Sequence, residues 1–213
     1  MKTDELISLL AAGPVAVEPE AASRRYVVAL GWGAFGATLL MAILLGVRPD
    51  LAEAAMLPMF WMKLGFPGAL AAGALIAARR LSTPGMRLGR LTGALAAPVV
   101  AIWALAALAL ARAAPGEREA LVLGSTWDLC PAYIALLSVP AFAAALWAMK
   151  GLAPTRLPLA GAASGLLAGS IAALVYALHC PEMDAPFLAT WYLLGMLLPT
   201  AAGALVGPAV LCW

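Results

Sequence analysis

The stretch PLAGAASGLLAGSIAALVYALHCPEMD, residues 158–184, decides the fold of this chain. From Pro158 to Leu178 it is an apolar run of about 20 residues, which as a helix with a rise of about 1.5 Å per residue would cross a hydrocarbon core of about 30 Å. The run then stops at a short polar turn that holds the only histidine, a Cys-Pro pair and two carboxylates. We therefore expect a membrane helix followed by a turn outside the membrane.

Five further apolar runs of similar length flank this one. The chain has 213 residues, is 64% hydrophobic and 11% charged, and has a mean hydropathy of +0.96, whereas soluble domains are nearer one half apolar. Backbone polar groups in lipid must be satisfied internally, which favours helices. We predict an all-α polytopic membrane protein, a bundle of six transmembrane helices. The expected spans are 26–47, 55–78, 91–111, 130–149, 158–178 and 187–211.

Basic residues are distributed unequally between the two sides of this predicted bundle. Nine of the thirteen Lys and Arg lie in the amino-terminal tail and the two loops that share its side; three lie in the opposite loops, and Lys63 lies inside a span. Cytoplasmic loops carry the excess of Lys and Arg. We therefore expect a multi-pass protein of the bacterial inner membrane with both termini in the cytoplasm. The nine residues are Lys2, Arg24, Arg25, Arg79, Arg80, Arg87, Arg90, Lys150 and Arg156.

Residues 1–25 form a polar tail, separate from the membrane domain of residues 26–213. The tail lacks the continuous apolar core of a signal peptide, so we expect it to stay attached. Thr3 could cap a short helix whose first turn holds two acids, which favour that position. Such a helix is marginal alone in water and needs a partner or a membrane surface to order it. Its apolar residues are Leu6, Ile7, Leu9 and Leu10.

Glycines recur at every fourth position in two of the predicted helices. Gly161, Gly165 and Gly169 share one helix face, as do Gly203 and Gly207. Small residues at this spacing let helix backbones approach closely in a membrane. The pattern predicts either a compact six-helix bundle or a homodimer joined through helices.

Cys130 and Cys180 are the strongest candidates for chemistry, because each precedes a proline at an outer helix end. One hypothesis is a redox-sensitive pair; another adds His179 to make a thiolate and imidazole site for a soft metal. The alternatives are a stapling disulfide or two buried small residues. The spacing is not a zinc-finger pattern, so a metal stays unassigned. The nearby carboxylates are those of Asp128, Glu182 and Asp184.

Lys63 and His179 each allow a functional and a structural interpretation. A charge inside a span is a candidate for transport or proton relay. No acid lies inside another span to pair with Lys63, so we expect it to snorkel or to bind carbonyls near Pro58. His179 could tune the neighbouring thiol, although a lone histidine at a helix end more often hydrogen-bonds a carbonyl.

The chain contains no nucleotide-binding loop, no Ser-His-Asp order and no His-Glu-x-x-His motif. We therefore expect no enzyme, no cofactor and no direct contact with nucleic acid. Two competing functions remain in view. A membrane thiol-disulfide oxidoreductase would use the outer cysteines but lacks a Cys-x-x-Cys pair, and a small transporter would lack acids within its spans.

The chain as a whole resembles a known family. The tail Met-Lys-Thr-Asp-Glu-Leu-Ile-Ser-Leu-Leu, the six spans, Trp127-Asp-Leu-Cys-Pro131 and His179-Cys-Pro-Glu182 together resemble the NrsF-like family of integral-membrane anti-sigma factors of proteobacteria. This resemblance covers essentially the whole length.

The resemblance implies a regulator that binds an extracytoplasmic-function sigma factor through the tail, keeps it from RNA polymerase, and releases it under heavy-metal or oxidant stress. Cys130 and Cys180 match the periplasmic cysteines that take part in sensing, with His179 as a neighbour. Leu6, Ile7, Leu9 and Leu10 would contact the sigma factor, and lipid would surround the helices. The tail has no His-x-x-x-Cys-x-x-Cys element, so a zinc-containing anti-sigma domain is not implied.

Overall fold

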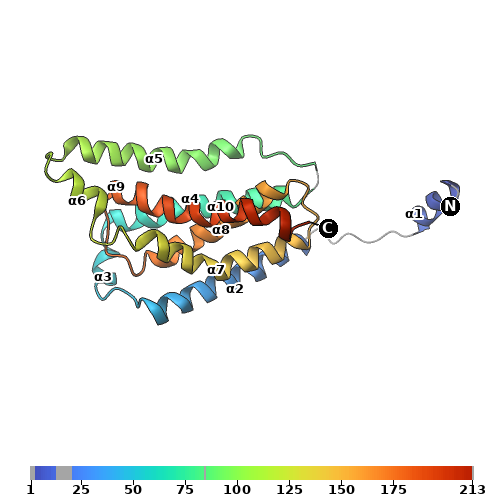
Figure 1. The fold of residues 1–213 in the computed structure, drawn as a ribbon, viewed down its shortest axis with the longest axis horizontal. Coiled ribbons are helices and arrows are strands. Elements are labelled where there is room, and N and C mark those ends of the chain that lie inside the picture. Colours follow the sequence, from blue (N-terminus) through green and yellow to red (C-terminus); the bar gives the residue numbers. More distant parts are fainter. Residues whose placement is uncertain (1–2, 13–20, 84, 213) are drawn as a thin grey trace.

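The computed structural model describes residues 3–12, 21–83 and 85–212, and every regular element among them is a helix (Figure 1). This confirms the predicted all-α class. The elements are α1 (Thr3–Ala12), α2 (Ala21–Leu44), α3 (Leu51–Ala54), α4 (Pro58–Leu81), α5 (Leu91–Arg112), α6 (Arg118–Leu123), α7 (Cys130–Lys150), α8 (Leu157–Tyr176), α9 (Ala185–Phe187), the π-helical turn η1 (Leu188–Tyr192) and α10 (Leu193–Val210).

Within the described residues, six helices are long and apolar enough to cross a membrane, as predicted from the sequence. They are α2, α4, α5, α7, α8 and the continuous run from α9 through η1 to α10. The boundaries differ by a few residues from the expected ones. The first helix begins at Ala21 rather than Tyr26, and the last begins at Ala185 rather than Phe187.

Helix α8 occupies the centre of the bundle. It packs against α10, α7, α4 and α2, and most of its residues are buried. In contrast, α5 lies along one side of the bundle in Figure 1, contacts α4 and α9, and buries few of its residues. A helix that is apolar all round and buried by protein is a core element, whereas an apolar helix with little protein around it must face lipid.

The closest helix contact joins α8 to α10 through their glycines. A Cβ atom added at Gly161 would collide with the carbonyl oxygen of Gly203, and one at Gly165 would collide with that of Pro199. Each glycine therefore allows backbone-to-backbone contact, as the four-residue spacing predicts. The same device joins α2 to α7, where a Cβ at Gly33 would lie 2.7 Å from the Cα of Ala141.

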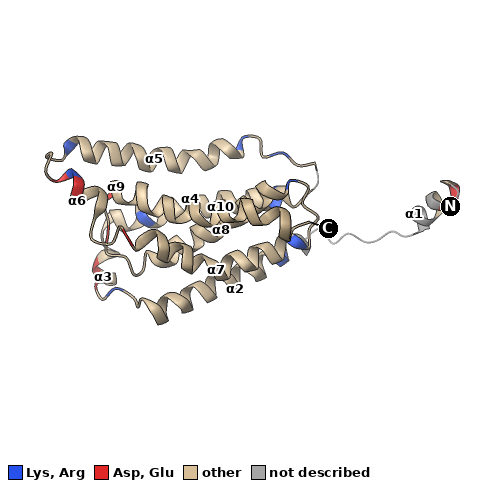
Figure 2. Ribbon diagram, viewed as in Figure 1, with Lys and Arg blue, Asp and Glu red and all other residues tan. Residues whose placement is uncertain are grey.

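The two ends of the bundle differ in charge. Figure 2 shows that, outside α1, the acidic residues gather at the end that carries α3 and α6, whereas most basic residues lie at the opposite end. Cys130 begins α7 and Cys180 follows α8, and both lie at the acidic end. We call this the thiol end and the opposite one the arginine end.

The glycine contact leads to a prediction about stability. Gly161→Ala should lower the melting temperature of the purified protein by several degrees, because forcing a methyl group into a packed interface costs about 1–3 kcal/mol and each kcal/mol is worth about 2–4 °C in a chain of this size. Gly93→Ala is the matched control, since nothing lies within 4 Å of a Cβ there. Thermal unfolding in detergent measures both, and equal melting temperatures would contradict the backbone contact.

Candidate functional site: the buried thiol pair

The two candidate cysteines come together at the thiol end, as the short connection between their helices predicts. Cys130 is the first residue of α7, and Cys180 lies in the turn after α8, where its N–H donates to the carbonyl of Tyr176 over 3.0 Å. Both side chains are fully buried in one hydrophobic cluster, within interaction range of each other, and both are free thiols. The pair is therefore assembled but closed to solvent.

Tyrosines form the wall around the thiols. The rings of Tyr176 and Tyr192 lie 5.8 Å apart, and each tyrosine neighbours both cysteines. Tyr192 belongs to the π-helical turn η1, a kind of irregularity that often marks functional sites. Its hydroxyl is buried beside the thiol of Cys180.

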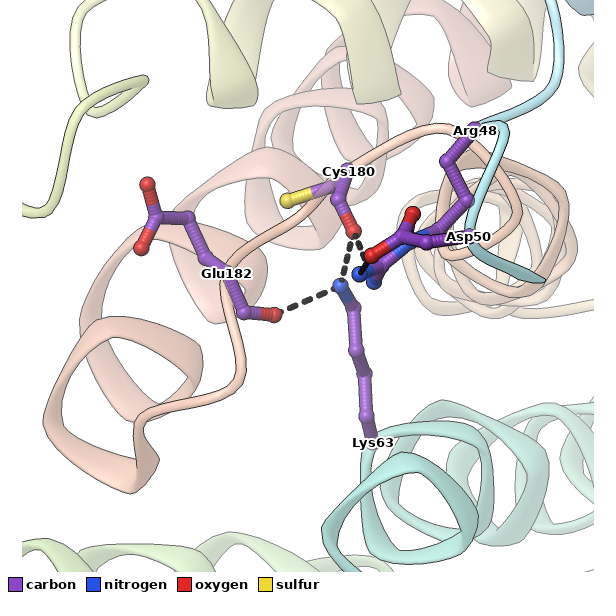
Figure 3. Close-up of polar contacts among 5 residues, drawn as sticks. All are labelled: Arg48, Asp50, Lys63, Cys180 and Glu182. Atoms are coloured by element: carbon purple, nitrogen blue, oxygen red, sulfur yellow. Dashed lines mark hydrogen bonds and ion pairs between the residues drawn. The ribbon is translucent and has the colours of Figure 1, made fainter. Parts of the chain in front are cut away.

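Lys63 reaches this pocket from α4 and holds the turn that carries Cys180 (Figure 3). Its Nζ donates to the carbonyl oxygens of Cys180 and Glu182, each over 2.7 Å, and lies 5.4 Å from the ring centre of Tyr192. The expectation that Lys63 would bind carbonyls is confirmed, but their location is not. They belong to a turn more than 100 residues away instead of the segment near Pro58, because α4 and α8 pack side by side.

Arg48 is a second cation at the same turn. It donates from Nη1 to the carbonyl of Cys180 over 3.3 Å, and its backbone N–H donates to the carbonyl of Leu178 over 3.1 Å. Nε and Nη2 also hold both carboxylate oxygens of Asp50, at 2.7 and 2.6 Å. This fork lowers the pKa of Asp50 below its ordinary value, chiefly through the hydrogen bonds from Arg48. The carboxylate thus keeps its charge and orients Arg48.

Glu182 ties the same turn to the loop before α7. Its carboxylate accepts hydrogen bonds from the N–H and hydroxyl of Ser125, at 2.8 and 2.6 Å, and in Figure 3 it points away from Lys63. Gly124 makes this approach possible: its φ is +58°, and a Cβ there would lie 2.8 Å from the Glu182 carboxylate. Nearby, burial raises the pKa of Asp184, with a smaller effect from Glu182.

His179 has a structural contact. Its Nδ1 lies 3.0 Å from the carbonyl oxygen of Gly46, which can only accept, so Nδ1 donates. The expectation that His179 hydrogen-bonds a backbone carbonyl is therefore confirmed. Among residues 3–12, 21–83 and 85–212, no group of three or more His, Cys, Asp or Glu side chains is arranged to hold a metal ion. The carboxylates named with the thiols in the sequence do not form a coordination sphere with them.

The sequence analysis did not single out Arg48, Ser125 or Tyr192 as functional residues. Arg48 is one of several arginines in the loops, Ser125 is a small polar residue, and Tyr192 lies within an apolar span. Of the three, only Tyr192 could have been noticed from the sequence, because a hydroxyl within a transmembrane segment needs a hydrogen-bond partner. The contacts of all three depend on which helices pack together.

The tail contains one helix, α1, which spans Thr3–Ala12. α1 begins at Thr3, which was expected to cap it, and places Asp4 and Glu5 in its first turn as predicted. Ile7 is exposed. The side chains of Leu6, Leu9 and Leu10, which we expect to contact a partner, lie outside the described residues, as does the whole of residues 13–20.

Comparison with known proteins gives the same family along the chain. The family model described as "NrsF: Negative regulator of sigma F" matches residues 10–213. A protein of Azospira oryzae named "Probable anti-sigma-F factor NrsF" is 58% identical over 213 residues, and the "Anti-sigma-F factor NrsF" of Caulobacter vibrioides is 40% identical over 215 residues. Both alignments cover all of each chain. No solved structure matches.

The closed pocket leads to a prediction about thiol reactivity. In the folded, detergent-extracted protein, a maleimide should modify Cys212, which is exposed, on the order of 100-fold faster than Cys130 or Cys180, because the bundle must open locally before the buried thiols react. Mass spectrometry of peptides after timed labelling measures the three rates, and unfolding in denaturant should make them equal. Labelling of either buried cysteine at the rate of Cys212 would contradict the pocket.

Proposed function

The chain belongs to the NrsF family of negative regulators of sigma F, and from this premise we propose that it is a membrane-bound anti-sigma factor. It would bind an extracytoplasmic-function sigma factor through its tail, and release that factor when an oxidant or a heavy metal reaches Cys130 and Cys180. The observation that carries the proposal is 58% and 40% sequence identity, over the full length, to two proteins named as anti-sigma-F factors.

The charges support one orientation in the membrane. The arginine end would face the cytoplasm of the bacterial inner membrane, because Lys and Arg accumulate on that side. Both chain termini would then be cytoplasmic, and the tail would meet a cytoplasmic partner. The thiol end would face the periplasm, a compartment in which disulfides form and persist.

The tail has the features of a segment that binds a groove. Residues 1–25 would be the sigma-binding tail and residues 26–213 the sensor, although the helix of the first span already begins at Ala21. A ten-residue helix is marginal by itself, so a partner would supply the order. An amphipathic helix usually lays its apolar face in a hydrophobic groove. The residues we assign to that face are Leu6, Ile7, Leu9 and Leu10.

The thiol pair has the features of a switch. A two-electron oxidant would join Cys130 to Cys180 as a disulfide, taking up two electrons while two protons leave the thiols. A thiol-binding heavy metal would bind the same two sulfur atoms as thiolates. Either event links the first residue of α7 to the turn after α8. It would change repression only if the linked bundle differs in its affinity for the sigma factor.

The competing functions find less support. A thiol oxidoreductase must exchange electrons with partners, whereas both thiols are fully buried. The transporter interpretation depended on a functional charge at Lys63. That side chain instead binds two backbone carbonyls at one end of the bundle.

The proposed role of the tail leads to a prediction about binding. Leu9→Asp should reduce retention of the sigma factor by at least about tenfold, because a charge replaces an apolar anchor that a groove would desolvate. Ser8→Ala, on the same helix at an exposed hydroxyl, is the control and should retain it. Pull-down from detergent extract with full-length protein measures both. Retention by a chain that lacks residues 1–20 would exclude the tail as the binding segment.

The proposed role of the thiol pair leads to a prediction about induction. The double variant Cys130→Ser and Cys180→Ser should still repress but should no longer respond to oxidant or cadmium, because serine keeps the volume and removes the reactive sulfur. Cys212→Ser is the matched control and should respond normally. A reporter of the sigma factor's target gene measures induction. Normal induction in the double variant would remove sensing from this pair and leave the anti-sigma role intact.

A further inference from the structure

We propose that Lys63 is a latch for the thiol pair: its amino group holds the Cys180 turn closed, and loss of that hold opens the pocket. The inference rests on the proposed function for its effect on repression, whereas its effect on the thiols can be measured without a sigma factor. Lys63 would be a positioning residue, since it acts on the thiol through the backbone of Cys180.

The turn depends on side chains for its position. Between Cys180 and Asp184 the backbone belongs to no helix, and Pro181 has no N–H to donate. The carbonyls of Cys180 and Glu182 both accept from Lys63 at 2.7 Å. Lys63 lies in the second turn of α4, so these two bonds fix the turn to a long helix.

The carbonyl that Lys63 holds belongs to the sensing residue itself. The Cys180 carbonyl carbon is bonded to the Cα that bears the thiol, so a displacement of this backbone segment away from Lys63 moves the thiol with it. Since the thiols of Cys180 and Cys130 are both fully buried, a small displacement of this turn decides whether a solute can reach them. The latch therefore controls access, and the neighbouring contacts from Arg48 and Ser125 add to it.

The positive charge of Lys63 limits how strongly it can hold the Cys180 turn in the closed state. Lys63 and Arg48 donate to the same carbonyl oxygen, yet the only ion pair among the described residues joins Arg48 to Asp50. Lys63 is fully buried and has backbone carbonyls in place of a carboxylate. A cation without a counter-charge is costly to bury, so the hydrogen bonds work against a desolvation penalty. An uncharged donor would hold the turn without that penalty.

The test compares the reactivity of Cys180 in full-length protein in lipid nanodiscs. Cys130→Ser and Cys212→Ser leave Cys180 as the only thiol, and a small charged methanethiosulfonate is the probe. Adding Lys63→Met, which keeps the length and removes the donors, should speed modification by at least about tenfold, as the loss of hydrogen bonds from a charged group implies. Arg48→Met should give a smaller increase, because its bond to the carbonyl is longer.

Two controls separate the latch from general loosening. Lys150→Met makes the same substitution at an exposed helix end and should leave the rate within about twofold, as is usual for surface sites. Ser170→Cys places a reporter thiol in the buried middle of α8, and in the background without the native cysteines it should stay unmodified with Lys63→Met. An unchanged Cys180 rate would overturn the latch, as would a reporter thiol that reacts as fast as Cys180.

The reporter gene then tests the link to repression separately. Lys63→Met in the native cysteine background should sensitise induction, so that less oxidant is needed for the same response. A faster Cys180 with unchanged induction would support the latch and count against sensing at this pair, so failures of the two proposals are distinguishable.

Discussion

The structure depends most on how one buried cation is satisfied. Lys63 lies inside an apolar bundle, and among the described residues its partners are two backbone carbonyls and the face of Tyr192. Carbonyls of a non-helical turn have no helix partner and so accept readily from a side chain. α8 stops at Tyr176 and the chain runs without helix from Cys180 to Asp184, which leaves the carbonyls of Cys180 and Glu182 for Lys63. The buried lysine and the thiol turn therefore satisfy each other.

That turn is also restrained from both sides. The helix before it, α8, and the helix that follows η1, α10, touch through their backbones at Gly161 and Gly203. Helices in direct contact cannot slide without forcing atoms together, because interiors are close-packed. The segment between them is therefore anchored through both helices. If the contacts of Lys63 are lost, the elements free to move are the turn that carries Cys180 and α7, which begins with Cys130.

Sequence reasoning predicted the fold well and the site only partly. Six apolar runs and the glycines at 161, 165, 203 and 207 are local signals that need no tertiary information. They predicted the number of membrane helices and the faces available for close packing, whereas the pairing of α8 with α10 came from the structure. The proximity of the two thiols was predicted from the short connection between the helices that carry them. The partners of Lys63 did not follow, because a lysine binds whichever carbonyls its neighbouring helix presents, and that depends on packing across 117 residues of sequence. The role of Arg48 was missed for the same reason.

The arginine end offers a physical route from the thiols to the tail. α4 carries Lys63 near one end and Ser82 just after the other, roughly 28 Å away at about 1.5 Å per residue, and the Ser82 hydroxyl lies 2.8 Å from that of Tyr26 in α2. α7 begins at Cys130 and carries Trp147 near its other end, where the centre of the Trp147 ring lies 4.5 Å from the guanidinium carbon of Arg25.

α4, which carries Lys63, and α7, which begins with Cys130, therefore both contact the first turns of α2, the helix that follows the tail in the sequence. Rigid helices carry a displacement along their length, and coupling requires a junction with two arrangements. α4 and α7 contact α2 through a hydroxyl pair at Tyr26 and a stacked cation at Arg25. A displacement of α4 or α7 at the thiol end that reached these two contacts would act on the helix next to the tail that we propose binds the sigma factor.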